Sequence, residues 1–72
     1  MTTVMNLRGL RCPQPVLRLA IKANTLSRGE VVQVHADCPS FADDIRKWCE
    51  DSGKVLVNVV EVGGSFTATV QL

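Results

Sequence analysis

The tetrapeptide Cys-Pro-Gln-Pro at residues 12–15 places a thiol where a helix is expected to begin. Pro13 suits the first helical turn, because its ring fixes φ near the helical value and its missing N–H would have had no intrahelical partner. Cys12 is therefore predicted to be the N-cap residue. The positive end of the helix dipole and the nearby Arg8 and Arg11 all favour the thiolate, which is the nucleophilic form of cysteine.

The second proline limits this activation. Pro15 removes another N–H from the first turn, which leaves mainly the amides of Gln14 and Val16 to face an anion. A moderate effect suits thiol exchange, since the nucleophilicity of a thiolate falls as its pKa falls. The alternative for Cys12 is a small buried hydrophobic residue that happens to cap a helix. The neighbouring prolines and arginines favour the reactive thiol over this alternative.

The chain has two further cysteines and a single histidine. Cys38 could form a reversible disulfide with Cys12, or it could be a turn residue before a second helix. The acidic neighbour Asp37 favours the turn, because a negative charge opposes thiolate formation. Cys49 falls on an apolar helical stripe and is expected in the core. His35 is expected to be a solvated sheet residue, since a lone histidine provides no base–nucleophile pair.

Composition restricts the classes of protein to which the chain can belong. Its length predicts one domain, residues 1–72, with a small core. Eight Lys and Arg against seven Asp and Glu give a formal charge of +1, which argues against direct, extended nucleic-acid binding. No apolar run approaches the roughly 20 residues of a membrane helix, and the N-terminal residues lack the apolar core of a signal peptide. A cytoplasmic protein without membrane contact is expected.

The cysteine pattern argues against a disulfide framework and against a metal site. Three is an odd number, and the cysteines are not closely paired as in small secreted domains, so reduced thiols are expected. There is no Cys-x-x-Cys pair, and His35 with Cys38 supplies only two of the four ligands that a zinc site usually has. We expect neither a metal nor an organic cofactor.

Apolar periodicity predicts two helices and four strands. The helices are expected over about residues 13–26 and from the segment 37–40 to about residue 52, with Ser40 and Asp43 forming a capping box. The strands are expected over 4–7, 31–36, 54–62 and 65–72, the last two joined by the hairpin signal Gly63-Gly64. The predicted buried positions of the helices are Val16, Leu19, Ala20, Ala23, Leu26, Phe41, Ile45, Trp48 and Cys49. Alternation places Val32, Val34 and Ala36 on one face of their strand, and Phe66, Ala68, Val70 and Leu72 on one face of theirs.

The order βαβαββ predicts an α/β two-layer sandwich, in which a four-stranded mixed sheet carries both helices on one face. If the first two strands are parallel, both helices begin at the same edge of the sheet. Cys12 and Cys38 would then both follow the carboxyl ends of strands, where sites in such folds tend to form.

Two surface features could serve a partner protein. One is a basic collar that could dock an acidic partner, although a solvated helix face explains it equally well; its members are Arg8, Arg11, Arg18 and Lys22. The other is an apolar patch of outward-facing sheet residues, Val31, Val57 and Val59.

Residues 7–17 resemble the signature of the TusA/SirA family of small sulfur-carrier proteins, a Cys-Pro-x-Pro motif after a glycine-containing turn. The resemblance covers nearly the whole chain and includes Gly29-Glu30, the Asp37-x-Pro39 segment, Asp44-Ile45 and Gly53. It implies a βαβαββ sandwich that carries sulfur as a persulfide on Cys12. The residues expected to support this thiol are Gly9, Arg11, Pro13, Gln14 and Pro15.

The resemblance also implies partners. A donor protein, either a cysteine desulfurase or a rhodanese, would load the carrier, and an acceptor sulfur-relay protein would unload it, in tRNA thiolation, molybdenum-cofactor synthesis or dissimilatory sulfur oxidation. Such a carrier acts stoichiometrically rather than as a turnover enzyme, and a monomer is expected because the relay surfaces must stay available. Asn6 and Gln14 stand where many members have acidic residues, and Cys38 stands where Asp is common. These departures leave the donor, acceptor and pathway open.

Two other functions compete with sulfur carriage. A regulatory or RNA-associated adaptor would bind its partner independently of Cys12, but the low net charge and scarce aromatic residues argue against it. A redox switch would use a Cys12–Cys38 disulfide. Under mild oxidant a gain of one sulfur atom would support carriage, whereas a loss of two hydrogens would support the switch.

Overall fold

The computed structural model describes residues 2–11 and 14–72 of the chain. Its elements follow the predicted order βαβαββ. They are β1 (Thr2–Asn6), α1 (Gln14–Ala23), β2 (Val31–Ala36), α2 (Phe41–Ser52), β3 (Val55–Val62) and β4 (Ser65–Gln71).

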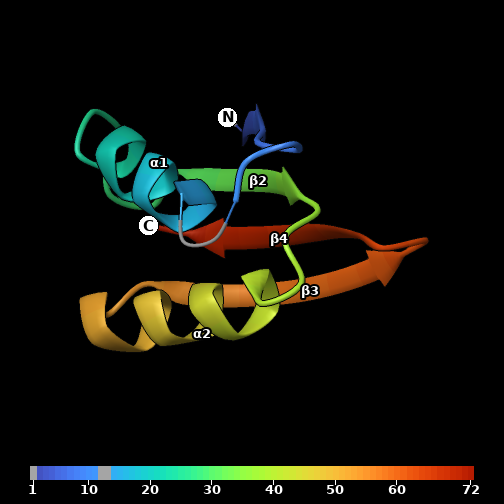
Figure 1. The fold of residues 1–72 in the computed structure, drawn as a ribbon. Helices are drawn as coiled ribbons and strands as arrows, with labels where there is room; N and C mark the ends of the chain where they lie inside the picture. The colour runs from blue at the N-terminus through green and yellow to red at the C-terminus, as the bar shows by residue number, and fades with distance from the viewer. Residues whose placement is uncertain (1, 12–13) are drawn as a thin grey trace.

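The strands form one mixed sheet in the order β1-β2-β4-β3. β1 and β2 are parallel, whereas β4 runs antiparallel to both β2 and β3. Figure 1 shows α1 and α2 on the same side of this sheet, with α2 alongside β3. The predicted two-layer architecture, with one face of the sheet covered by helices, is therefore confirmed.

The core lies between the sheet and the two helices. Every second residue of β2 and β4 is buried there, as strand alternation predicts. Phe41, Ile45 and Cys49 of α2 are buried at helical spacing, while Trp48 is only partly buried against them. The Phe41 ring lies against Phe66 of β4, with 6.1 Å between the ring centroids. This aromatic contact joins α2 to the middle of the sheet.

The first helix is shorter than predicted. It ends at Ala23 rather than near Leu26. The Thr25 N–H and its hydroxyl both donate to the Lys22 carbonyl, at 2.9 and 2.8 Å, so this carbonyl is capped by a turn instead of by a continuing helix. Asn and Thr compete for backbone groups in this way and are weak helix formers. Of the predicted α1 stripe, Val16 and Leu19 are buried and the other members are only partly buried.

The predicted capping box at the start of α2 is wrong. Ser40 makes no side-chain hydrogen bond to the backbone of the helix. Its hydroxyl donates instead to the Asp44 carboxylate, 3.2 Å away. The Ser40 backbone has φ −97° and ψ 9°, which is not the extended conformation that an N-cap side chain needs to reach the first-turn amides.

The predicted apolar patch on the sheet is also partly wrong. A register shift between Leu56 and Asn58 of β3 interrupts the alternation of side chains between the two faces. Val59 consequently pairs with Ala68 and packs against the core, whereas Val57 is 55% exposed. Val31 is half-buried on β2. If side chains alternated strictly between the two faces from one end of β3 to the other, Val59 would be assigned to the wrong face.

No helix in the described parts of the chain is long and apolar enough to cross a membrane.

Candidate functional site

Cys12 and Pro13 lie outside the described residues, so the candidate site is defined by the segments on either side of them. The loop of residues 7–11 leads from β1 to Cys12, and Gln14 opens α1. The predictions that Cys12 caps the helix and that Pro13 occupies its first turn remain predictions.

The loop before Cys12 is held against the carboxyl end of β2 by two hydrogen bonds. The Leu7 N–H donates to the His35 carbonyl at 2.7 Å, and the Gly9 N–H donates to Asp37 Oδ1 at 3.0 Å. Gly9 has φ +88°, a conformation that disfavours any residue with a Cβ. The segments that follow β1 and β2 therefore lie together at one edge of the sheet, as the parallel arrangement predicted.

The two arginines of this loop differ in their contacts. Arg8 Nε donates to the Ser65 hydroxyl, 3.0 Å away at the beginning of β4. This contact ties the Arg8 side chain to the β3–β4 hairpin. Arg11 is exposed immediately before Cys12 in the chain. Arg11 is thus the better placed of the two to meet a partner that approaches this edge.

The start of α1 corrects one prediction about the site. The sequence predicted that the Gln14 N–H would face an anion. In the structure this N–H donates to the Arg11 carbonyl at 2.8 Å, so it already has a partner. Because Pro15 has no N–H, the first turn is an even weaker anion cradle than expected. The Gln14 side chain is exposed, and Pro15 is buried. Pro15 therefore anchors the beginning of α1 in the core, and Gln14 presents an amide to solvent.

The two described cysteines are both poorly placed to be the primary nucleophile. Cys38 is 6% exposed and is disulfide-bonded, which departs from the expectation of reduced thiols; its Sγ lies 3.7 Å from the Ser40 hydroxyl oxygen. Cys49 is a free cysteine with 3% exposure, and burial raises the pKa of its thiol. Since the thiolate is the reactive form, a raised pKa makes the Cys49 thiol a poor nucleophile. Its burial makes Cys49 a core residue, as predicted.

His35 is tied into the sheet rather than solvated. It is half-buried, and its Nδ1 lies 3.0 Å from the Thr67 hydroxyl oxygen on β4. Its backbone carbonyl holds the loop through Leu7. His35 thus supports the loop through its backbone.

The structure adds Asp37 to the residues that organise the site. Sequence reasoning treated it only as an acidic neighbour of Cys38, yet its carboxylate is the acceptor that fixes Gly9. An aspartate directly after a buried strand was the available signal, because short polar side chains at strand ends often bond nearby backbone groups.

Replacing Asp37 by alanine is expected to loosen the loop before Cys12. The Gly9 N–H would lose its acceptor, which costs about 1 kcal/mol for an exposed hydrogen bond, and its amide hydrogen should exchange roughly fivefold faster. Asp37→Asn retains a carbonyl oxygen and is the matched control. Hydrogen exchange followed by NMR measures this directly. An unchanged Gly9 rate in Asp37→Ala would show that the bond does not hold the loop.

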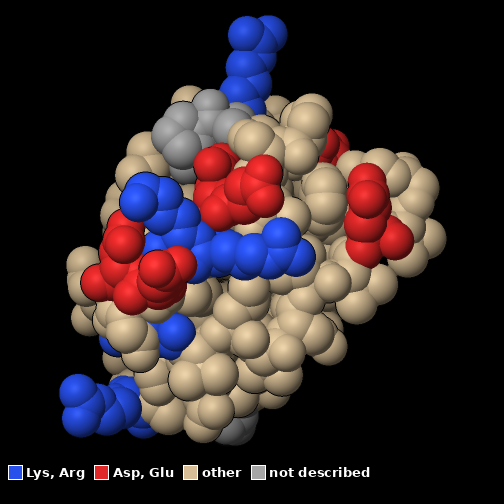
Figure 2. All heavy atoms as spheres, turned by 90° about the horizontal axis from the view of Figure 1, so that it is seen from below, with Lys and Arg blue, Asp and Glu red and all other residues tan. Residues whose placement is uncertain are grey.

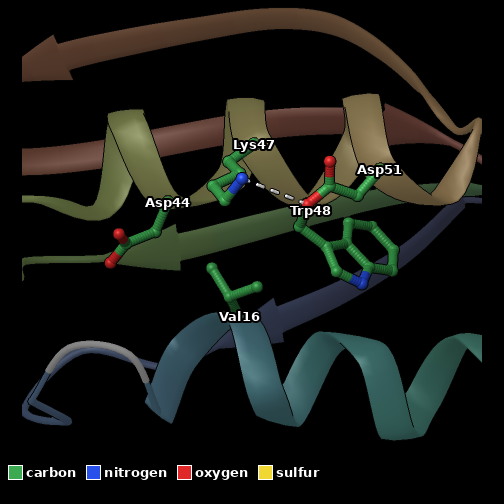
Figure 3. A pocket seen from close by; sticks show the side chains of 5 residues that line it. All are labelled: Val16, Asp44, Lys47, Trp48 and Asp51. Carbon is green, nitrogen blue, oxygen red and sulfur yellow. Dashed lines mark ion pairs between the residues drawn. The ribbon is translucent and has the colours of Figure 1, made fainter.

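A hollow of about 240 Å³ lies between the two helices, close to the start of α1. Figure 3 shows Val16 of α1 facing the Trp48 indole of α2, with Asp44 and Asp51 on either side. Lys47 Nζ lies 3.4 Å from the Asp51 carboxylate, so the cation at this hollow already has a partner. Within residues 2–11 and 14–72, no three His, Cys, Asp or Glu side chains gather as metal ligands would.

The surface that includes α2 carries charges of both signs. Figure 2 shows Lys and Arg side chains interspersed with Asp and Glu on this side of the molecule. α2 carries two exposed ion pairs, Arg46 with Asp43, 3.7 Å apart, and Lys47 with Asp51. Such a surface offers no continuous basic field for a nucleic-acid backbone.

Comparison with known proteins assigns this arrangement to a family. A family model described as Sulfurtransferase TusA matches residues 3–72. The chain is 36% identical over 63 residues to the sulfur carrier protein TusA of Pseudomonas aeruginosa, an alignment that covers 88% of this chain and 80% of that protein.

Two further relatives have names that describe them as candidate sulfur carrier proteins. One, from Neisseria meningitidis, is 33% identical over 67 residues, or 93% of this chain and 90% of that protein. The other, from Aquifex aeolicus, is 31% identical over 67 residues, or 93% of this chain. The match covers 34% of the Aquifex protein, which is therefore much longer.

Proposed function

The chain belongs to the TusA sulfurtransferase family, and on this premise we propose that Cys12 accepts sulfane sulfur as a persulfide and relays it to an acceptor protein. A sulfur-carrier role is common to the names of the relatives. Those names do not state which residue carries the sulfur or that the sulfur passes between two proteins.

The observation that carries the proposal is the way the chain is held just before Cys12. Both partners of the loop, the His35 carbonyl and the Asp37 carboxylate, belong to the carboxyl end of β2 and the residue after it. The loop is thereby fixed at a sheet edge, where a donor protein can approach. Cys49 offers no competing site, because it is buried and its raised pKa disfavours the thiolate.

The chemistry of loading needs only two thiols and one sulfane sulfur. The Cys12 thiolate attacks the terminal sulfur of the donor's persulfide, and a new S–S bond forms on Cys12 while the donor's S–S bond breaks. The donor cysteine leaves as a thiolate and takes up the proton that Cys12 released. Unloading repeats this step, with an acceptor thiolate as nucleophile and Cys12 as leaving group. Neither step has a net oxidation.

The supporting residues have separate roles in this proposal. Pro15 is buried and fixes the start of α1. Arg11 and Gln14 lie on either side of residues 12–13 in the chain, and both are exposed and can contact a partner. The donor is a cysteine desulfurase or a rhodanese, and the pathway is tRNA thiolation or dissimilatory sulfur oxidation. The carrier works as a cytoplasmic monomer without a cofactor. It contacts proteins rather than nucleic acid.

Locating the transferred sulfur tests the proposal. The reduced protein is incubated with glutathione persulfide, digested under non-reducing conditions, and the peptides are weighed by mass spectrometry. We expect a gain of one sulfur atom on the peptide that contains Cys12. The peptides that contain Cys38 and Cys49 should keep their original mass.

Three other results would overturn the proposal. Sulfur on Cys38 or Cys49 would place carriage elsewhere in the chain. A loss of two hydrogens that links the Cys12 and Cys38 peptides, without any added sulfur, would favour a thiol redox switch. No modification at all would favour a binding module, with partner binding independent of Cys12.

A further inference from the structure

A second hollow, of about 310 Å³, separates the edge strand β1 from α1. Its β1 side is apolar and its α1 side carries two cations. The lining residues are Met5, Leu7, Arg18, Ile21, Lys22 and Thr25. Ile21 is 65% exposed, which leaves apolar surface beside the cations open to solvent.

The two cations of this hollow have no ion-pair partner within residues 2–11 and 14–72. The exposed ion pairs in that part of the chain both lie on α2, where Arg46 and Lys47 are paired with aspartates. Arg18 and Lys22 are one helical turn apart and line the same hollow. An occupant with carboxylates would therefore find charges that are not already neutralised.

The backbone beside the hollow is also available. β1 is an edge strand, and Leu7, the residue directly after it, donates its N–H to the His35 carbonyl of β2. Because backbone polar groups alternate in direction along a strand, the N–H and C=O groups of Val4 and Asn6 point to the outer edge. No described strand pairs with this edge.

We propose that the outer edge of β1 and the adjacent β1–α1 hollow together bind an extended, acidic and apolar segment of the donor or acceptor protein as a fifth strand. The segment's backbone bonds the free groups of β1. Its apolar side chains contact Ile21 and Met5, and its carboxylates meet Arg18 and Lys22. An edge strand beside a helix binds peptides in this mode, in which main-chain bonds supply affinity and the flanking groove supplies specificity.

The opposite edge of the sheet is less suitable for the same partner. β3 also exposes valines, including Val55 and Val62, but its register is broken by the shift between Leu56 and Asn58. Such a shift twists a strand and blunts an edge against pairing. β3 also carries Glu61, which would repel an acidic segment. Charge and regularity therefore both favour β1.

This inference rests on the proposed function, because it names how a relay partner docks, but its test does not use the thiol. The Cys12→Ser protein, labelled with nitrogen-15, is titrated with the peptide acetyl-Ser-Leu-Ser-Glu-Ser-Leu-amide. We expect saturable shifts centred on β1 and α1, and slower amide exchange at Val4 and Asn6. The same peptide with lysine in place of glutamate should bind at least about tenfold more weakly, because its positive charge would be repelled by Arg18 and Lys22.

A pair of charge reversals provides the matched control. Arg18→Glu with Lys22→Glu should weaken binding at least about tenfold, whereas Arg46→Glu with Lys47→Glu changes the net charge equally and should leave binding unchanged. Amide spectra establish that both double variants fold. Absence of binding, shifts centred on β3, or equal loss in both double variants would overturn the docking proposal. Each of these results leaves sulfur carriage on Cys12 intact, and a failure of sulfur loading leaves the peptide result intact.

Discussion

The Cys12→Ser variant should gain no sulfur from glutathione persulfide, while the wild-type protein gains one sulfur atom per chain. A serine hydroxyl cannot form the S–S bond that holds sulfane sulfur, so the loss should be complete rather than partial. The measurement is the intact mass of each protein after excess donor is removed. The fold should be unaffected, because the substitution exchanges one small side chain for another.

Two single variants serve as controls for this result. Cys38→Ser and Cys49→Ala replace the other two cysteines one at a time, and each reduced variant should still gain one sulfur atom. Cys49→Ala removes a buried side chain and is expected to lower stability, so its loading is measured below its unfolding transition. Carriage would belong to a different cysteine if Cys12→Ser still gained one sulfur atom. The same would follow if only Cys38→Ser failed to gain sulfur.

The largest effect on stability is expected from Phe41→Ala. Phe41 is fully buried at the start of α2, and its ring packs on Phe66. Removing such a side chain costs about 3–5 kcal/mol, and a domain of 72 residues has a total stability of about 4–11 kcal/mol. The variant should therefore be either largely unfolded or only marginally stable, and its urea midpoint should lie far below that of the wild type.

Leu17→Ala is the matched control for this prediction, because Leu17 is an apolar side chain that is 55% exposed on α1. Its free energy of unfolding should lie within about 0.5 kcal/mol of the wild-type value. Equal urea midpoints for Phe41→Ala and the wild type would contradict the structural role of this ring. Phe41 also matters for the site, since its N–H donates to the Cys38 carbonyl at 3.0 Å and fixes the turn before α2.

Sequence patterns predicted the architecture because hydrophobic alternation and helix stripes reflect burial directly. The strands of residues 31–36 and 65–71 match their predictions closely, since both alternate regularly and each begins after a glycine-containing turn. The hairpin at Gly63 and Gly64 was equally predictable, because both residues adopt positive φ, the conformation that this turn requires.

Local choices between competing hydrogen bonds were not predictable in the same way. Two acidic residues lie within the four positions that follow Ser40, and the structure pairs Ser40 with Asp44 rather than forming the capping box with Asp43. The end of α1 depended on Thr25, which bonds the Lys22 carbonyl through its hydroxyl. In each case several partners were within reach along the chain, and the backbone conformation selected one.

Long-range contacts at the site were beyond the reach of sequence patterns. The Asp37–Gly9 hydrogen bond joins residues 28 positions apart, and Arg8–Ser65 joins residues 57 positions apart. The topology predicted that the segments after β1 and β2 meet, but not which atoms would bond. Register has a similar effect in β3, where one irregularity moves Val59 from the expected outer face to the core.

Transfer of sulfur from the loaded protein to a second thiol tests the central claim most directly. The purified protein carrying one sulfur atom on Cys12 is mixed with reduced glutathione, and both products are followed by mass spectrometry over time. We predict that glutathione persulfide forms in an amount equal to the Cys12 thiol that is regenerated. If the sulfur stays on the protein, or if its loss produces a Cys12–Cys38 disulfide instead of a free Cys12 thiol, the protein is not a persulfide relay.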